Sequence, residues 1–461
     1  MAKVSGIEIY KHLPRTNCGD CGVPTCMAFA MQVSSKKKAL DECPHVSDEA
    51  RAALGDAQLP PMATVSIGAG EDRLTLGGET VMHRHEERFQ HPPVLAIRID
   101  ASLDEQAIDA RIAAIEALRF ERVGKTIGID AVAVSDAGGD GAAFRNAVLQ
   151  VADRTAMPLI LLCNAPDRLT PVVAPIAERR PLLVAATEGN AEAMASLAVA
   201  HSLPLVVRAP GIERTAALAE RIAQAGVNEL LLDPQGADLS TTLTTSIQLR
   251  RLALEQHVRA AGYPIYIDVG RQRDADNHSE AQTAFQMAAA ISGVLRYAGV
   301  LVLDTVEPWA IHPIVTVRQD IYTDPQVPNA VEAKLYEIGN PGPNAPVLVT
   351  TNFALTYFTV AGEVESSKVP AFISVIDTEG LGVLNAYADD RLTAERIVEV
   401  VREQGAMDRV RHNRLIIPGL IARLRMAIEE VSGWDVVVGP EDAGGIPRFL
   451  NELQARSEAA E

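Results

Sequence analysis

Short apolar runs that alternate with alanine-rich amphipathic stretches fill the middle of this chain, and they constrain its fold more than any other feature. Stretches such as Ala191–Ala200 and Ala281–Leu295 have the spacing of helices. The alternation predicts parallel strands joined by right-handed crossovers. Eight repeats fit a closed (β/α)8, or TIM, barrel, so the expected fold class is α/β. The eight expected strands are Val94–Ile99, Ala131–Ser135, Leu159–Cys163, Leu182–Ala185, Leu205–Arg208, Glu229–Asp233, Ile265–Asp268 and Val300–Asp304.

Polar residues stand at the ends of several of these runs. In (β/α)8 barrels the carboxyl ends of the strands carry the working side chains. The same residues could instead cap the helices that follow, and capping is the simpler interpretation for most of them. The residues concerned are Asp100, Asp136, Asn164, Asp233, Asp268 and Asp304.

Another α/β unit follows the barrel, after the Pro/Gly-rich linker Gly339–Pro346, and is called the third unit. Its four apolar runs alternate with helical patterns, but four strands are too few to close a barrel. We therefore expect an open, doubly wound, Rossmann-like sheet. The expected strands are Val347–Val349, Ala371–Ile376, Leu415–Ile417 and Trp434–Val438, and the expected helices are Asn352–Ala361, Ala394–Gln404, Gly419–Val431 and Ala443–Ala455.

These patterns divide the chain of 461 residues into about three domains, as its length suggests. A small cysteine-rich unit covers residues 1–60, and a connecting segment with two short strands covers residues 61–92. The barrel covers residues 93–312, and the open α/β unit covers residues 313–461. The cysteine-rich unit, residues 1–60, is too short to bury much apolar surface. A bound metal would therefore supply part of its folding stability.

Four of the five cysteines lie in the first unit, at Cys18, Cys21, Cys26 and Cys43. Thiolates bind soft metals, and three close cysteines with one more distant are typical of iron–sulfur sites. Zinc is the alternative, but zinc sites usually pair their ligands as two short knuckles, so the spacing favours iron–sulfur. Cys163 ends an apolar run, and we interpret it as a small buried side chain.

The charge balance disfavours some functions. With 42 basic and 60 acidic side chains the net charge is −18, which repels nucleic acid. No apolar run approaches the ~18 residues that a membrane span needs. Residues 1–11 contain no hydrophobic signal core. We expect a soluble cytoplasmic protein that binds neither nucleic acid nor a membrane.

Three stretches carry a resemblance to a known family. They are the cysteine segment TNCGDCGVPTCMAFA at Thr16–Ala30, the segment Val349–Phe358, and the pair Leu415–Gly419 and Gly433–Pro440. Together with the order of the units, they resemble the large (gamma) subunit of the corrinoid/iron–sulfur protein of the acetyl-CoA decarbonylase/synthase system. The resemblance covers essentially the whole chain.

The resemblance implies two cofactors, a 4Fe-4S cluster and a corrinoid (cobamide). The cluster would lie on Cys18, Cys21, Cys26 and Cys43, and the corrinoid would be bound by the C-terminal unit. The cobalt would accept a methyl group as Co(I) from a methyltetrahydropterin of the folate or methanopterin type, and would pass it to acetyl-CoA synthase. The cluster would return the electron when Co(II) forms. The cobalt carries the chemistry, so no catalytic side chain is expected.

The resemblance also implies partners. The barrel would pair with a small (delta) corrinoid/iron–sulfur subunit in a heterodimer. Acetyl-CoA synthase would receive the methyl group, and a separate methyltetrahydropterin methyltransferase would supply it. A low-potential electron donor would reduce the cluster.

The carboxyl ends of the third unit's strands are the expected corrinoid site, because open α/β sheets bind ligands there. Glycine, proline and small hydroxyl residues at these ends admit a bulky ligand, and helices that start at Asn352 and Gly419 would point free N–H groups toward it. Ordinary turn chemistry is the alternative, since any α/β domain places such residues there. The expected contacts are Thr350, Asn352, Thr356, Thr378, Glu379, Gly380, Leu381, Pro418, Gly419, Gly439 and Ala443.

One feature departs from many corrinoid proteins. The chain lacks an Asp-x-His-x-x-Gly loop that would place a histidine below the cobalt, and His412 is the only histidine after residue 312. We interpret His412 as a solvated polar residue. A cobalt without a strong lower ligand is easier to reduce to Co(I), as the proposed role requires.

Two other functions fit part of the pattern. A barrel methyltransferase that binds the pterin itself would need an acid and a base at the barrel mouth. An electron-transfer subunit would need the iron–sulfur cluster but no corrinoid.

Overall fold

The computed structural model describes residues 6–34, 38, 40–47, 50, 61–136, 138–236, 238–271, 280–324 and 327–458. Contacts divide the chain into two compact units. The first comprises Met1–Phe120 and Ile127–Thr323, and the second comprises Glu121–Thr126 and Asp324–Glu461. The boundary that the sequence suggests at residue 60 lies outside the described residues.

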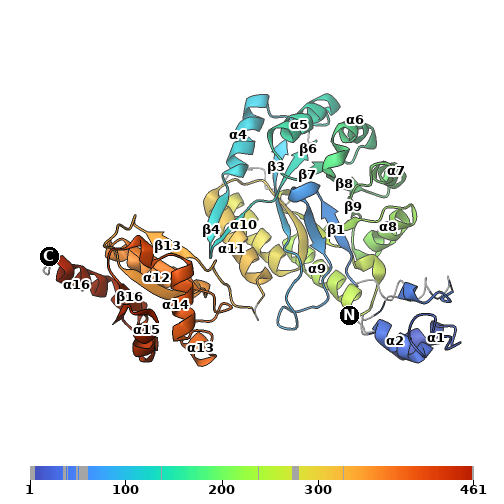
Figure 1. Ribbon diagram of the computed structural model, residues 1–461. Helices are drawn as coiled ribbons and strands as arrows, with labels where there is room; N and C mark the ends of the chain where they lie inside the picture. Colours follow the sequence, from blue (N-terminus) through green and yellow to red (C-terminus); the bar gives the residue numbers. More distant parts are fainter. Residues whose placement is uncertain are drawn as a thin grey trace. The chain divides into compact units, whose positions relative to one another are not determined.

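The core of the first unit is a closed barrel of eight parallel strands (Figure 1). All eight strands expected from the apolar runs are present, so the prediction of a (β/α)8 barrel is confirmed. The first strand pairs with the last and closes the sheet. In chain order the strands are β3 (Val94–Asp100), β6 (Ala131–Ser135), β7 (Leu159–Leu162), β8 (Leu182–Ala186), β9 (Leu205–Arg208), β10 (Leu230–Asp233), β11 (Ile265–Asp268) and β12 (Ala298–Leu303).

The strands are almost wholly apolar because both of their faces are buried. Along β3, Leu95 and Ile97 pack against the helices outside the barrel, whereas Val94 and Ala96 face the interior. Helices follow the strands around the barrel (Figure 1). They are α4 (Glu105–Glu116), α5 (Gly141–Arg154), α6 (Pro166–Ile176), α7 (Ala191–His201), α8 (Ile212–Gln224), α9 (Leu239–Leu254), α10 (Glu280–Leu295) and α11 (Pro308–Tyr322).

A short antiparallel hairpin, β1 (Thr64–Ile67) with β2 (Leu74–Gly77), closes the amino end of the barrel. Its apolar side chains Val65 and Leu76 join the interior cluster of the barrel. At the hairpin's inner turn, a Cβ on Gly68 would lie 2.9 Å from Pro158, which directly precedes β7. The open ends for ligands are therefore the carboxyl ends of the strands.

A second hairpin, β4 (Arg119–Arg122) with β5 (Lys125–Gly128), is inserted after α4. Its turn residues Val123 and Gly124 have φ values of 51° and 68°, which two-residue turns between right-twisted strands require. The tip of this hairpin, Glu121–Thr126, belongs to the second unit, although its stem continues from the barrel.

The second unit is built on an open five-stranded sheet in the order β13-β15-β14-β16-β17. Four strands are parallel, and the edge strand β13 (Leu335–Ile338) is antiparallel to its neighbour. The expected strands are present, whereas β13 and the short helix α13 (Val383–Ala388) are additions. The parallel strands are β14 (Val347–Thr351), β15 (Ala371–Ile376), β16 (Arg414–Ile417) and β17 (Asp435–Val438).

Apolar clusters cover both faces of this sheet. Val347 and Val349 of β14 pack with α13, α14 (Ala394–Glu403) and α15 (Arg425–Ser432) on one face. Leu348 packs with α12 (Ala354–Ser367) and α16 (Ile446–Glu458) on the other. Two expected helices begin as short 3-10 turns, at Gly419–Leu424 and Ala443–Gly445.

The thiol-rich N-terminal unit is small. Its described residues form α1 (Gly6–His12), α2 (Cys26–Ser34) and a 3-10 turn, Leu40–Glu42. Ile9, Phe29 and Val46 lie in its core. Among the helices of the described ranges, none combines the length and the apolarity that a membrane span requires.

Arg318 offers a test of the barrel's packing. It is 8% exposed, and it donates to the carbonyls of Pro93 (3.0 Å) and Gly128 (2.8 Å) and pairs with Asp130. We expect Arg318→Met to lower the free energy of unfolding by about 3 kcal/mol, because it leaves a carboxylate and two carbonyls without their partner. Arg154→Met, which breaks a half-exposed pair with Asp109, should cost less than about 1 kcal/mol. Equal urea midpoints for the two variants would contradict this expectation.

Candidate functional site

The thiols form the first candidate site. Cys26 and Cys43 are buried, Cys21 is half-buried against the same small core, and Cys18 is exposed three residues earlier on the same loop. All four are free of disulfides. The structure therefore gathers three of the four predicted ligands around one core, with the fourth at its surface. Soft sulfur donors in this number suit an iron–sulfur cluster.

Local hydrogen bonds shape the thiol loop. Asn17 accepts from the Cys26 amide through Oδ1 (2.8 Å), and its own amide points at the Cys26 sulfur (3.4 Å). Lys38 donates to the Cys21 carbonyl (2.9 Å). Gly19 and Gly22 adopt φ values of 81° and 76°, a left-handed backbone that favours glycine. An added Cβ on Gly19 would meet nothing within 4 Å, so there is space beside the thiols.

An acid–base pair flanks Cys18. The imidazole Nε2 of His45 lies 2.6 Å from the Asp20 carboxylate. Hydrogen bonds from His45 and Cys18 lower the pKa of Asp20 below its usual value. Ligand atoms of these three residues lie within 4.8 Å of one another. The pair places a carboxylate next to the exposed thiol of the segment.

The second candidate site is the carboxyl edge of the open sheet. Because β15, β14, β16 and β17 are adjacent and parallel, their carboxyl ends meet at one edge. Asn352 follows β14, Thr378 follows β15, Pro418 follows β16 and Gly439 follows β17. The structure thus brings the expected corrinoid contacts from four strands to one edge.

Asn352 organises this edge. It is 5% exposed, and its Oδ1 accepts from the amides of Thr378 (3.0 Å) and Gly380 (3.0 Å). Its Nδ2 donates to Asp377 (2.8 Å). One side chain therefore fixes the loop that follows the neighbouring strand.

The other expected contacts on this loop differ in exposure. Glu379 is exposed, has a φ of 55° and pairs with Arg391. Leu381 is half-buried, and its carbonyl accepts from the Thr378 hydroxyl (2.8 Å). Thr356 is half-buried in the first turn of α12, and Ala443 is half-buried after β17.

The expectation of free N–H groups at Asn352 and Gly419 is wrong. Helix α12 begins at Ala354, and the Asn352 amide donates to the Ile376 carbonyl (2.8 Å). The Gly419 amide donates to the Pro440 carbonyl (3.0 Å). A Cβ at Gly419 would lie 2.7 Å from the backbone of Gly439, so this glycine allows two loops to approach. Both amides are used within the fold.

Two threonine hydroxyls on β14 need a partner. Thr350 and Thr351 are 1% and 0% exposed, and their Oγ1 atoms have no hydrogen-bond partner among the described residues. They point to opposite faces of the sheet at its carboxyl end. Buried polar groups without a partner are rare, so each of these hydroxyls is a candidate for contact with a bound group on its own face of the sheet.

The segment before β13 was missed by sequence reasoning. The amide of Val331 donates to the Asn352 carbonyl (2.8 Å), and the Asn329 carbonyl accepts from the Ala354 amide (2.8 Å). A Cβ on Gly380 would lie 3.0 Å from Pro328. This segment crosses the edge near Asn352, and nothing in its Pro- and Asn-containing sequence indicated that contact.

His412 lies at the opposite, amino end of the sheet. Its Nε2 bonds to the Ala345 carbonyl (3.0 Å), and its Nδ1 accepts from the Arg414 amide (3.1 Å). His412 is therefore half-buried and structural. The interpretation of His412 as a solvated polar residue is wrong.

The carboxyl end of the barrel carries a network of ion pairs. Arg208 of β9 pairs with Asp233 (2.6 Å), and Arg98 of β3 pairs with Asp268. Arg98 also lies 3.4 Å from Asp304. The capping interpretation is wrong for these aspartates, because their carboxylates pair with arginines on the inner face of the barrel.

Cys163, at the end of β7, is 4% exposed as expected. Burial raises the pKa of its thiol to about 11, and the thiol donates to Asp136 (3.2 Å). Asp136 in turn pairs with Arg168 (3.0 Å). A protonated, buried thiol of this kind is inert.

Two family models match different parts of the chain. Residues 64–450 match the model for the CO dehydrogenase/acetyl-CoA synthase delta subunit, a range that covers all strands of the barrel and of the open sheet. Residues 13–45 match a model described as "Putative Fe-S cluster", which covers all four thiols. A thiol segment, a barrel and an open sheet thus define a multidomain protein of the CO dehydrogenase/acetyl-CoA synthase class.

Relatives with known names match the whole chain. It is 43% identical over 446 residues to the corrinoid/iron–sulfur protein large subunit of Moorella thermoacetica, covering 97% of this chain and 98% of that protein. It is 36% identical over 456 residues to the acetyl-CoA decarbonylase/synthase complex subunit gamma of Methanopyrus kandleri, covering 98% of each. The chain belongs to the family of these large, or gamma, subunits.

Among solved structures, dihydropteroate synthase from Thermus thermophilus matches with a TM-score of 0.40 and 16% identity. The match covers 56% of this chain and all of that protein. A likeness this low does not bear on the site.

The role of Asn352 can be tested directly. We expect Asn352→Ala to lower the free energy of unfolding by about 3 kcal/mol, because the amides of Thr378 and Gly380 lose their shared acceptor. Those two amides should also lose protection from hydrogen exchange. Asn385→Ala, on an exposed position of α13, is the matched control and should change neither quantity. Unchanged protection in Asn352→Ala would show that the loop is held by other contacts.

Proposed function

We propose that this chain is the methyl-carrying subunit of a corrinoid/iron–sulfur protein in the acetyl-CoA synthase system. One observation carries the proposal. A segment with four free thiols and an open sheet with unpartnered buried hydroxyls at its carboxyl edge occur in one chain, and that chain matches its relatives over nearly their full length. The name of the Moorella relative joins the same two cofactors.

The cluster residues in this proposal are Cys18, Cys21, Cys26 and Cys43. Their soft donors fit a 4Fe-4S cluster, and the left-handed Gly19 leaves space beside the loop. The cluster, when bound, supplies the electron that restores an oxidised cobalt. The chain's own contribution is to hold the thiols: Asn17 fixes the start of α2 at Cys26, and Lys38 fixes the Cys21 carbonyl.

The corrinoid would be bound by the C-terminal unit, which we assign as a doubly wound, Rossmann-like domain. Its predicted start at residue 313 lies inside the barrel helix α11, so we place the start at Asp324. The corrinoid, when bound, supplies the cobalt that takes up and releases the methyl group. Thr350 would meet its polar arms, and the loop from Thr378 to Leu381, fixed by Asn352, would lie beside it. The expected contacts Thr356, Glu379, Gly380, Pro418, Gly439 and Ala443 complete the edge, and Gly419 acts by permitting close loop packing.

Exposed apolar side chains border the same edge. Leu355, Leu384 and Leu420 are 68%, 56% and 43% exposed, and each lies in the first helical turn that follows a parallel strand. Apolar side chains at these places suit contact with the rim of a macrocycle and with a partner subunit. We assign the partner as the small (delta) subunit, in a heterodimer.

The remaining assignments follow from this role. Residues 1–60 would be the cluster domain and 61–92 a connecting segment. The barrel would begin at residue 93 and extend beyond the predicted end at 312, because that position lies inside the barrel helix α11 (Pro308–Tyr322). A methyltetrahydropterin methyltransferase would deliver the methyl group, acetyl-CoA synthase would receive it, and a low-potential donor would reduce the cluster. The proposed activity is therefore that of a methyltransferase component in the cytoplasm.

The absorption spectrum of the anaerobically purified heterodimer tests the proposal. Corrinoid bands together with a broad iron–sulfur shoulder are expected. A shoulder without corrinoid bands would instead support an electron-transfer subunit, and the proposal would fail.

Iron analysis tests the ligand set. We expect Cys26→Ser and Cys43→Ser to lower the iron content well below the about four irons per chain of a 4Fe-4S protein. Cys163→Ser, at a buried thiol that the proposal leaves unused, should retain the full iron content. Equal iron in Cys43→Ser and Cys163→Ser would remove Cys43 from the ligand set.

The electron-relay role has a separate test. Cys21→Ala should leave methyl transfer close to normal in protein reduced beforehand, because transfer itself needs no cluster electron. Reactivation of oxidised protein by a low-potential donor should fall at least 100-fold. Methyl transfer is followed by the loss of the absorption of the corrinoid state that starts this step. Reactivation is followed by the loss of the absorption of the oxidised corrinoid. A parallel loss of both rates would contradict the relay.

A further inference from the structure

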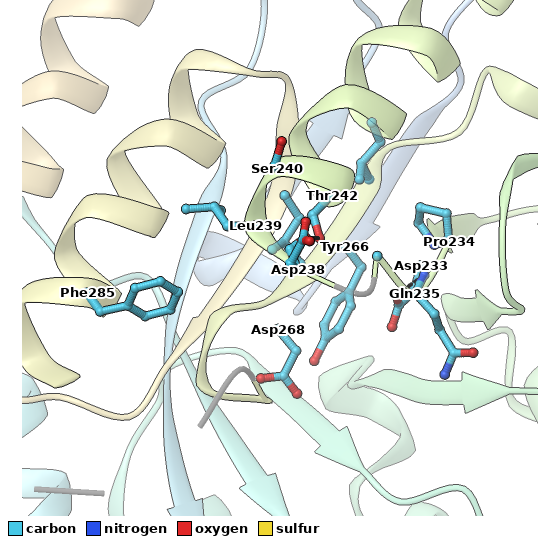
Figure 2. Close-up of a pocket in the computed structure, with 13 residues that line it drawn as sticks. Asp233, Pro234, Gln235, Asp238, Leu239, Ser240, Thr242, Tyr266, Asp268 and Phe285 are labelled. Carbon is cyan, nitrogen blue, oxygen red and sulfur yellow. Dashed lines mark hydrogen bonds between the residues drawn. The ribbon is translucent and has the colours of Figure 1, made fainter. Parts of the chain in front are cut away.

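The cavity at the carboxyl end of the barrel contains carboxylates that serve the fold itself (Figure 2). Asp233 pairs with Arg208 (2.6 Å) and accepts from the Gln235 amide (3.1 Å), and Asp238 accepts from the Thr241 amide (2.7 Å) at the start of α9. Charged side chains beside the thiols are placed differently, because they lie against residues that would hold the cluster.

The ammonium of Lys38 lies against one of these residues. Its Nζ donates to the Cys21 carbonyl (2.9 Å), and a Cβ on Gly22 would lie 3.9 Å from the same Nζ. The ammonium is therefore held at the peptide that joins Cys21 to Gly22. Because the Lys38 side chain is only 25% exposed, water and salt screen its charge in part.

The carboxylate of Glu42 is the second charge of this pair. Its Oε2 lies 2.6 Å from the Lys38 Nζ, and the residue directly precedes Cys43, the most distant of the four thiols in the sequence. The pair thus places a positive charge at Cys21 and a negative charge on the residue next to Cys43. Two ligand-bearing segments carry charges of opposite sign.

Charges near an iron–sulfur cluster change its reduction potential. One-electron reduction adds a negative charge to a cluster that four thiolates already make anionic. A nearby cation stabilises the reduced form and raises the midpoint potential, whereas a nearby anion lowers it. A tie that only holds two segments together would behave otherwise, because loss of either partner would loosen the same contact.

We propose that Lys38 and Glu42 set the reduction potential of the cluster, with Lys38 raising it and Glu42 lowering it. This inference rests on the proposed function, since it requires a cluster on the four thiols. The reaction concerned moves one electron from the low-potential donor to the cluster, and no bond or proton changes. Lys38 makes this reduction easier, and Glu42 preserves the driving force for electron transfer onward to the cobalt.

A redox titration of the anaerobic heterodimer, followed by the electron paramagnetic resonance of the reduced cluster, tests the proposal. Lys38→Met should lower the ratio of reduced to oxidised cluster at a fixed potential about threefold, which is a midpoint potential about 30 mV lower. Glu42→Gln should shift the midpoint by a similar amount in the opposite direction. Lys38→Arg keeps the charge and should keep the parental midpoint.

Lys11→Met is the matched control. Lys11 is exposed in the last turn of α1, where solvent screens its charge, so this variant should keep the parental midpoint. The proposal is overturned if Lys38→Met and Glu42→Gln shift the midpoint in the same direction, or if Lys11→Met shifts it as far as Lys38→Met. If Lys38→Met retains no cluster, an unchanged midpoint in Glu42→Gln overturns the proposal. A parent protein without a cluster signal would instead refute the proposed function, and the inference with it.

Discussion

Closure of the barrel is the constraint on which the first unit depends. β3 must pair with β12, and the inner face of the closed sheet must be filled or neutralised. The side chains that fill the barrel toward its amino end are apolar, but Arg98 lies near the carboxyl end of β3. Burying an unpaired charge there would be costly. Its contacts with Asp268 on β11 and with Asp304, which follows β12, neutralise this charge and link β3 to the last two strands of the barrel. The polar carboxyl end is therefore a requirement of the fold before it is a feature of any site.

Elements that follow from apolar periodicity could be predicted from the sequence, and those that depend on distant contacts could not. The eight barrel strands are continuous apolar runs because both faces are buried. The hairpin from Arg119 to Gly128 was missed because its strands are mostly polar or charged. Cysteine spacing identified the candidate ligands, yet not that Cys26 and Cys43 are buried while Cys18 is exposed.

The carboxyl edge of the open sheet shows the same limit at the level of a site. Strand ends indicated where the candidate residues would gather. The sequence could not show that Asn352 turns its side chain toward the next loop, or that Gly419 is needed for contact with Gly439. Both facts depend on partners far along the chain. Residues expected to meet a ligand can therefore act one step behind it, by holding the loops that do.

The hairpin tip at Glu121–Thr126 has a consequence for how this protein can be taken apart. The tip groups with the second unit although the rest of that unit begins at Asp324. The second unit is thus discontinuous in sequence. A fragment made by cutting the chain once before Asp324 would lack Val123, which packs on the apolar cluster around Tyr357. If residues from Asp324 onward were exchanged between family members, the hairpin tip of one protein would meet the apolar cluster of another. The tip and the segment from Asp324 onward are therefore expected to have evolved together.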